Sequence, residues 1–367
     1  MRIVVVGAGV IGSAVAFECA RRGARVQVLD PRPPGRGATH ASAGILAPYI
    51  EGHSPALRRL GVRGLALYDA FLARLNESAR SQPEYGRGGT LQAAFDDEGA
   101  RLLTESAGLL ADAALAHRML GGAAARALEP ALSDRVVAAL EIPDHGYVNP
   151  TALVDALVTG CAAHGATFDR ARVLALHASA SGVRIDADTG RIDADAVVLA
   201  AGSWTSCSWA PVPAGGGEPP IRPIRGQLLH LRSAAPVAAR VLWGPGCYVV
   251  PRHDGTLLVG ATVEDVGFDE RATLGGVRAM VDAASALVPG LDSAVLEEVR
   301  VGLRPATSDE LPIVGPSATM PHVYFASGHY RNGVLLAPLT AGLVADLVLH
   351  ERAGAELSGL HPARFGL

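Results

Sequence analysis

The chain has 367 residues, of which 49% are hydrophobic and 19% are charged, and its formal net charge is −4 at pH 7. These values are typical of a globular protein with a large core, the length allows two domains, and the charge gives no indication of a nucleic-acid partner or an anionic membrane. The cysteines Cys19, Cys161, Cys207 and Cys247 are scattered without a C-x-x-C pair. This pattern favours reduced thiols over a disulfide framework or a metal site.

The first thirty residues predict a unit that binds a dinucleotide. A β-branched strand, Ile3–Val6, runs into a G-x-G-x-x-G turn at residues 7–12. Small and apolar residues at helical spacing follow as far as Gly23, and a second strand over residues 25–29 ends in Asp30. A glycine-rich turn between a strand and a helix, with an acidic residue closing the next strand, is a strong signal for this function.

Each of these residues has a physical reason to be there. Gly7 permits a tight turn, Gly9 lets the backbone approach a pyrophosphate, and Gly12 allows the helix to pack closely on the strand. The N-terminus of the helix attracts the phosphates, and Asp30 is placed to accept hydrogen bonds from the adenosine ribose.

The chain enters the first expected strand by residue 3, which leaves no room for a signal peptide. No run approaches the roughly eighteen apolar residues of a membrane span. We therefore expect a cytoplasmic protein without a membrane partner.

A run of small residues, 38–48, follows a Pro/Gly/Arg-rich turn. Small side chains with hydroxyl groups suit a backbone that lies flat along a planar cofactor, although a tight loop is an equally good interpretation of this stretch alone.

The rest of the chain alternates between helical and strand patterns. Helices are predicted over residues 57–75, 97–110, 123–128, 151–165, 273–287 and 339–349. Strands are predicted over residues 88–95, 137–142, 173–177, 182–186, 191–193, 195–200, 227–231, 241–243, 248–251, 257–260, 294–303, 311–314 and 323–326.

Three connections in this series carry information about organisation. Residues 144–150 form a polar turn, and residues 253–255 join two strands as a hairpin. The Gly/Pro-rich residues 214–220 mark a crossing between domains. The buried strand before Ala201 and Gly202 indicates that the nucleotide-binding domain resumes there after an insertion.

Three further stretches, residues 43–48, 302–309 and 328–338, resemble the D-amino acid oxidase family of FAD-dependent amine oxidases, and most nearly its glycine oxidase branch, which serves thiamine biosynthesis. The resemblance covers nearly the whole chain. It implies an α/β fold with a glutathione-reductase-like, FAD-binding Rossmann domain and an antiparallel-sheet substrate domain. The FAD-binding domain is expected over residues 1–85, 146–222 and 300–367, and the substrate domain over 86–145 and 223–299.

The resemblance also implies three residues at the substrate. Arg304 matches the arginine that binds the substrate carboxylate, and a guanidinium suits this task because it forms two parallel hydrogen bonds with a carboxylate. Tyr248 matches a tyrosine that contacts the same carboxylate, and Arg331 matches a position close to substrate and flavin. The alternatives are an ion pair of Arg304 with Asp309 or Glu310, an ordinary sheet aromatic at Tyr248, and a purely structural loop residue at Arg331.

The residues expected to contact non-covalent FAD lie in the fingerprint, the small-residue run, the second half of the nucleotide domain and the C-terminal motif. They are Gly7, Gly9, Val10, Ile11, Gly12, Asp30, Pro31, Arg32, Ser42, Ala43, Gly44, Ile45, Val173, Ala201, Gly202, Trp204, His329, Tyr330, Arg331, Asn332, Gly333 and Val334. His329 is interpreted as a structural histidine and not as a base, Trp204 as packing near the cofactor, and no metal is expected.

The implied reaction is oxidative deamination of glycine, sarcosine or small D-amino acids, by hydride transfer to the flavin, to a 2-oxo acid, ammonia and hydrogen peroxide, with oxygen as the acceptor. The pocket wall near the substrate side chain is expected from residues 261–265 and from the region before residue 145. A homo-oligomer, either a tetramer or a dimer, is expected.

Three alternatives to this reaction stay open. One is a D-amino acid dehydrogenase that passes electrons to a quinone. Another is a sarcosine-oxidase-like enzyme, although no cysteine follows Cys247 to attach FAD covalently. The third is a flavin-binding scaffold without turnover.

Overall fold

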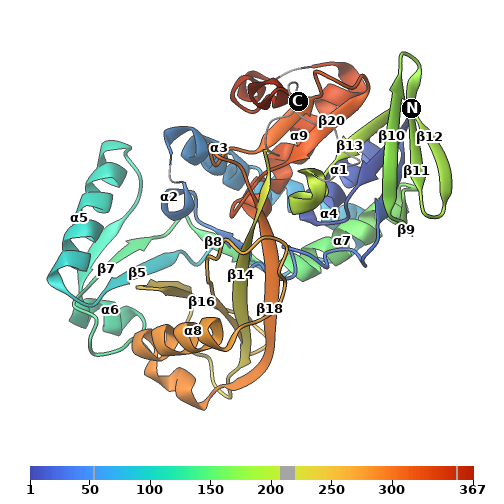
Figure 1. The fold of residues 1–367 in the computed structure, drawn as a ribbon. Helices are drawn as coiled ribbons and strands as arrows, with labels where there is room; N and C mark the ends of the chain where they lie inside the picture. Colours follow the sequence, from blue (N-terminus) through green and yellow to red (C-terminus); the bar gives the residue numbers. More distant parts are fainter. Residues whose placement is uncertain (53, 207–219, 353) are drawn as a thin grey trace.

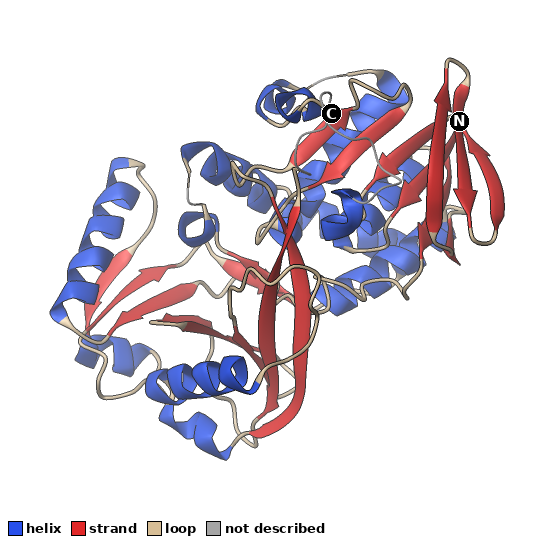
Figure 2. Ribbon diagram, viewed as in Figure 1, coloured by secondary structure: helices blue, strands red, loops and turns tan. Residues whose placement is uncertain are grey.

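The computed structural model describes residues 1–52, 54–206, 220–352 and 354–367. Its two large sheets, one of six strands and one of eight, each have their own helices (Figures 1 and 2). The mixed α/β architecture that the sequence predicts is confirmed. Most of the Gly/Pro-rich stretch predicted as a domain crossing, residues 214–219, lies outside the described residues.

The six-stranded sheet contains the dinucleotide fingerprint. Its order is β19-β20-β13-β1-β2-β9, and all neighbours are parallel except β19 and β20. The strands are β1 (Arg2–Val6), β2 (Arg25–Asp30), β9 (Thr167–Arg170), β13 (Ala196–Leu199), β19 (Ile313–Pro316) and β20 (Val323–Ser327). Strand β1 is apolar from Ile3 onward because both faces are covered: Ile3 and Val5 pack into one cluster, and Val4 and Val6 into another.

Helices cover one face of this sheet and a small antiparallel sheet covers the other (Figure 2). The helices are α1 (Val10–Arg21), α3 (Pro55–Ala66), α4 (Tyr68–Ala79), α7 (Pro150–Ala163) and α9 (Gly333–His350). The small sheet consists of β10 (Val173–Ser179), β11 (Gly182–Ala187) and β12 (Gly190–Ala194), as the sequence predicts.

The eight-stranded sheet has the order β18-β14-β17-β16-β15-β5-β7-β6, and only β15 and β5 are parallel neighbours. Its strands are β5 (Thr90–Ala94), β6 (Arg118–Gly121), β7 (Ala138–Ile142), β14 (Arg222–Arg232), β15 (Val241–Gly244), β16 (Cys247–Pro251), β17 (Thr256–Gly260) and β18 (Val295–Ala306). Helices α5 (Asp97–Asp112), α6 (Gly122–Leu128) and α8 (Leu274–Leu287) pack against it. The long strands β14 and β18 extend from this sheet towards the six-stranded one (Figure 1).

A short third sheet joins regions that the sequence treats as loops. Its order is β3-β8-β4, with β3 (Ile45–Leu46), β8 (Gly146–Val148) and β4 (Tyr85–Gly86). The prediction of a polar turn over residues 144–150 is therefore wrong in its middle. Strands of two or three residues are too short to show the alternating pattern by which a strand is predicted. Whether they form depends on pairing with segments that are distant in the sequence.

Two helical segments differ from the prediction by more than two residues. The stripe over residues 57–75 belongs to two helices, α3 and α4, which meet at Leu67. Helix α9 begins at Gly333, six residues before the predicted start, and contains Pro338. A proline has no N–H to donate to the carbonyl four residues earlier, that of Val334, and the Tyr68 hydroxyl donates to this oxygen instead at 2.6 Å.

Helix α9 also corrects the expectation that no run approaches the length of a membrane span. By length and composition its 18 residues could cross a membrane, but 72% of them are buried inside the structure. It packs against α1 and α3 in the core next to the six-stranded sheet. Its apolar character is thus accounted for by burial against other helices.

Candidate cofactor and substrate site

A long cavity of about 760 Å³ connects the dinucleotide fingerprint with the eight-stranded sheet. Every residue predicted to contact cofactor or substrate lines it, with the exception of Gly12. At Gly12 a Cβ atom would lie 1.9 Å from the carbonyl oxygen of Gly7, so this glycine serves the close packing of helix on turn.

The fingerprint end of the cavity has the geometry of a dinucleotide cradle. Gly7 has a φ of +110°, and a Cβ there would lie 2.4 Å from the carbonyl oxygen of Ala200. Asp30 at the end of β2 accepts hydrogen bonds from the backbone N–H groups of Ala8 and Arg32, each at 2.8 Å. These bonds fix the carboxylate at the cavity wall.

The small-residue run lies along the middle of the cavity, as the cofactor interpretation requires. Gly302 on β18 makes room for it, because a Cβ there would lie 2.8 Å from that of Ala41. From the other side the buried guanidinium of Arg252 donates to the carbonyl oxygen of Ala43 at 2.8 Å. Arg252 also lies over the ring of Tyr147, 4.8 Å from its centroid.

The far end of the cavity brings together Tyr248, Arg304, Arg331 and Glu51. Burial raises the pKa of Tyr248 to about 12; the charge of Arg304 opposes this shift, and that of Glu51 adds to it. The phenol therefore stays protonated and can donate a hydrogen bond to an anion throughout the neutral and mildly alkaline range.

Arg304 lies flat across Gly226 of β14, where a Cβ would come within 2.3 Å of both terminal nitrogens. Its Nη1 donates to the carbonyl oxygens of Thr262 at 2.9 Å and Arg225 at 3.3 Å. The alternative of an ion pair with Asp309 is wrong, because that carboxylate binds Arg364 at 2.7 Å. Arg304 lines the cavity and has no carboxylate partner among the described residues.

Arg331 and His329 occupy the turn before α9. Burial works to lower the pKa of Arg331, but a hydrogen bond to Tyr330 and the charge of Glu51 outweigh it and raise the pKa. His329 is buried and shares a 2.9 Å hydrogen bond with Thr340, and burial lowers its pKa to about 3. The imidazole is consequently neutral at physiological pH and hydrogen-bonded to Thr340 of helix α9.

Arg32 and Trp204 meet at the edge of the cavity. The guanidinium of Arg32 lies 4.5 Å from the centroid of the indole ring and pairs with Glu270 at 2.9 and 2.7 Å. The ring of Phe268 packs against the same indole. The segment around residues 268–270 therefore joins the eight-stranded sheet to the fingerprint.

Sequence reasoning missed Glu51, which lines the cavity near Tyr248 from the short helix α2 (Pro48–Glu51). The wall expected from residues 261–265 is present in Ala261 and Val263. Part of the pocket wall was also expected from the region before residue 145. Among the described residues 50–145, Glu51 is the one that lines the cavity. The sequence indicated this residue only by its place, because Glu51 is an acidic residue three positions after the Ala-Gly-Ile-Leu-Ala-Pro motif.

The fold and the cavity together are those of a dinucleotide-binding protein whose cavity runs from a largely parallel sheet to a largely antiparallel one. A family profile described as DAO, FAD dependent oxidoreductase, matches residues 2–347. The chain belongs to this family. Its FAD dependence, predicted from the C-terminal motif, is thus confirmed.

Relatives are similar over nearly the whole chain. Glycine oxidase from Geobacillus kaustophilus is 33% identical over 360 residues, covering 97% of this chain and 95% of that protein. The bifunctional protein ThiO/ThiG of Nostoc sp. is 35% identical over 99% of this chain, which spans only 55% of that longer relative.

Solved structures agree with these relatives. The crystal structure of glycine oxidase from Geobacillus kaustophilus matches with a TM-score of 0.90 and 32% identity, covering 100% of this chain and 98% of the other. Iminodiacetate oxidase from Chelativorans sp. BNC1 matches with a TM-score of 0.89 and 30% identity, covering 98% and 99%.

The cavity fits FAD on the evidence of its own residues. The dinucleotide end offers the open backbone at Gly9, the N-terminus of α1 and the carboxylate of Asp30. The volume of about 760 Å³ falls within the range of cofactor sites. Among the described residues no cluster of His, Cys, Asp or Glu could hold a metal ion.

Proposed function

We propose that this chain is an FAD-dependent oxidase that oxidatively deaminates glycine and other small amines bearing a carboxylate, such as sarcosine and small D-amino acids. The observation that supports it is the pairing of Arg304 and Tyr248 at one end of a cavity whose other end carries the dinucleotide cradle. The resemblance to glycine oxidases and to ThiO/ThiG supports this substrate and a role in thiazole formation for thiamine.

In this proposal the residues bind and orient the substrate. Arg304 holds the carboxylate through charged hydrogen bonds, the Tyr248 hydroxyl donates a further one, and Arg331 adds positive charge at the same end. FAD held along the fingerprint end would supply the redox chemistry, a two-electron oxidation of the amine with oxygen as the final acceptor and hydrogen peroxide as the product. The imine left from a neutral primary amine is hydrolysed to the 2-oxo acid and ammonia, and the imine left from sarcosine to glyoxylate and methylamine.

The proposal includes the organisation of the chain. Residues 1–85, 146–222 and 300–367 form the FAD-binding domain, and 86–145 and 223–299 form the substrate domain. FAD is bound non-covalently, and the protein is a cytoplasmic homo-oligomer without a nucleic-acid or membrane partner. Sedimentation of the purified protein tests the oligomer, and release of free FAD by acid tests the non-covalent attachment.

A second candidate is oxidation of secondary amines that carry carboxylates, which the 30% identical iminodiacetate oxidase supports. The two functions share the carboxylate grip of Arg304 and differ in the room that the cavity must leave around the nitrogen. Relative reduction rates with glycine, sarcosine and iminodiacetate separate them.

The test is an anaerobic titration of the yellow protein with glycine, sarcosine, iminodiacetate, D-alanine and D-proline in turn. Rapid bleaching by glycine, followed by return of colour in air with release of peroxide, is the expected result. Bleaching without return of colour would replace the oxidase with a dehydrogenase that uses another acceptor. A flavin that none of the five compounds reduces would refute the substrate class.

A further inference from the structure

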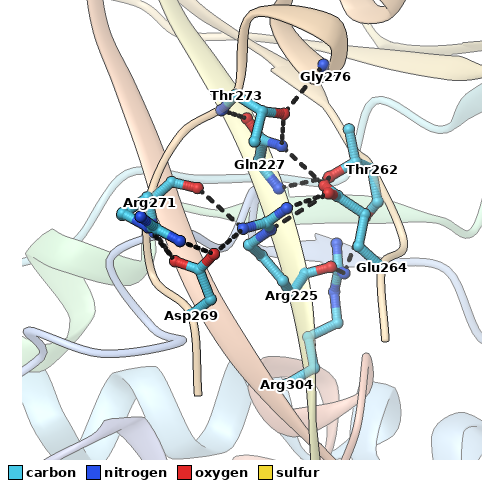
Figure 3. Close-up of polar contacts among 9 residues, drawn as sticks. All are labelled: Arg225, Gln227, Thr262, Glu264, Asp269, Arg271, Thr273, Gly276 and Arg304. Carbon is cyan, nitrogen blue, oxygen red and sulfur yellow. Dashed lines mark hydrogen bonds and ion pairs between the residues drawn. The ribbon is translucent and has the colours of Figure 1, made fainter. Parts of the chain in front are cut away.

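A closed polar network lies beside the guanidinium of Arg304 (Figure 3), and its members Arg225, Gln227, Thr262 and Glu264 do not line the cavity. Its centre is the carboxylate of Glu264, which accepts hydrogen bonds from Thr262 Oγ1 at 2.6 Å, from Gln227 Nε2 at 2.7 Å and from the Arg225 guanidinium. The side chain of Arg225 is only 5% exposed and also pairs with Asp269 at 3.0 Å. A buried cation with two carboxylates and a carboxylate with several donors make a well-satisfied network.

The same residues are bound to one another through their backbones. Arg225 N–H donates to Glu264 O at 2.8 Å, and Glu264 N–H returns a bond to Arg225 O at 3.0 Å. Gln227 N–H donates to the hydroxyl of Thr262 at 2.9 Å. Residues 262–264 therefore run alongside β14 as a short extra segment, and the side chain of Glu264 fastens this segment to the strand.

This arrangement fixes two carbonyl oxygens, those of Thr262 and Arg225, and both accept a hydrogen bond from Arg304 Nη1. Nη1 has two hydrogens, so both are used by the backbone. In the described part of the chain the hydrogen bonds of Arg304 run through Nη1, which leaves the edge formed by Nε and Nη2 for a ligand. That edge has the spacing of a carboxylate.

We propose that Glu264 is a positioning residue for substrate recognition: through Arg225 and Thr262 it sets the orientation in which Arg304 presents its Nε–Nη2 edge to the substrate carboxylate. This inference depends on the proposed function, in which Arg304 binds that carboxylate. Glu264 does not itself line the cavity. Burial works to raise its pKa, but hydrogen bonds from Arg225, Thr262 and Gln227 outweigh this and lower it, so the carboxylate is ionised at neutral pH.

The experiment compares FAD-loaded Glu264→Ala with Glu297→Ala. The control removes the same side chain from β18 of the same sheet, where Glu297 pairs with Arg232 away from the cavity. Acetate, a carboxylate without an amine, is titrated while the visible flavin spectrum is followed, and KM and kcat for glycine are measured. Glu264→Ala should raise both the acetate dissociation constant and KM on the order of tenfold, because the contact of Arg304 with the carboxylate is weakened and not removed. The kcat should stay within about twofold.

A merely structural role for Glu264 would lower FAD content or kcat and leave KM and acetate affinity unchanged, and that result would overturn the inference. Arg304→Ala is measured alongside. If it does not weaken acetate binding, the proposed function fails; if it does and Glu264→Ala does not, only the positioning role fails.

Two further variants keep the test decisive if Glu264→Ala does not fold. Glu264→Gln has the same shape and retains one acceptor, and should raise KM less than Glu264→Ala but more than the control. Thr262→Val removes the hydroxyl that Glu264 accepts from. Both substitutions act on the position of the Thr262 carbonyl oxygen. The double variant Thr262→Val with Glu264→Gln should therefore have a KM no higher than that of the single variant with the higher KM. Additive effects on KM would contradict action through the same carbonyl.

Discussion

A methyl group added at Gly226 tests the placement of Arg304 directly. In Gly226→Ala the new Cβ would lie 2.3 Å from Nη1 and Nη2 and 2.4 Å from Cζ of Arg304. Carbon atoms and guanidinium groups pack at about 3.5–4 Å, so the guanidinium has to move by roughly 1 Å or more. Since it is the end of a flexible side chain, this shift costs little folding stability, but it breaks the bonds to the carbonyl oxygens of Thr262 and Arg225.

The expected effect on substrate binding follows from what is lost. A charged, hydrogen-bonded contact with a carboxylate contributes about 2–4 kcal/mol, which corresponds to a rise in the KM of glycine of about 30-fold to 700-fold. Helix α8 provides the control: a Cβ added at Gly275 would meet nothing within 4 Å, so Gly275→Ala should leave KM essentially unchanged. Steady-state kinetics, FAD content and thermal unfolding are measured on both. A yellow, folded Gly226→Ala enzyme with unchanged KM would refute the assignment of Arg304.

Three other predictions concern the cofactor, the fold and the pH dependence. Gly7→Ala forces a side chain into φ +110° and against the carbonyl of Ala200, so the purified protein should lack visible flavin absorbance; full FAD content would contradict the cradle. Burial lowers the pKa of His145 to about 3, below its value near 6.5 in the unfolded chain, so its contribution to stability is present above pH 6.5 and is lost as pH falls towards 3. Urea unfolding measured between about pH 7.5 and 4.5 should show that the free energy of unfolding falls less steeply in His145→Gln than in the unchanged protein. The difference in slope should be up to about 1.4 kcal/mol per pH unit. Tyr248→Phe removes one hydrogen bond to a charged carboxylate, about 1.5–3 kcal/mol, and should raise KM about 12- to 140-fold. Because the pKa of Tyr248 is raised to about 12, the pH profile of kcat/KM below about pH 10 should not move.

The dinucleotide end of the site was predictable because its geometry is determined within thirty consecutive residues. The turn at Gly7 and the carboxylate of Asp30 meet through a hydrogen bond from Ala8 that spans 22 positions of sequence. Strand, turn, helix and strand each have a local signal, and together they leave one arrangement. Position 304 shows the opposite case: the sequence allowed an ion pair with Asp309, and only the folded chain reveals that Arg364 takes that carboxylate.

Predicted helix boundaries were wrong where contacts with distant parts of the chain outweighed a local sequence rule. A proline in a helical pattern predicts that the helix starts after it, but α9 contains Pro338 because Tyr68, 266 residues from Val334, satisfies the freed carbonyl. The stripe over residues 57–75 likewise spans α3 and α4 without a break in periodicity. Neither the hydrogen bond from Tyr68 nor the break between α3 and α4 can be recognised in the neighbouring sequence.

The proposed substrate end is built from four positions that are separated in sequence, Glu51, Tyr248, Arg304 and Arg331. Glycines are what make this convergence possible: Tyr248 lies across Gly260, where a Cβ would come within 2.5 Å of its hydroxyl, just as Arg304 lies across Gly226. Two large polar side chains can therefore lie flat on adjacent parts of one sheet and leave the space above them for a ligand. Recognition therefore depends as much on Gly226 of β14 and Gly260 of β17, which have no side chains, as on the guanidinium and the phenol. Substitutions at these two glycines accordingly distinguish a carboxylate site from an ordinary polar surface.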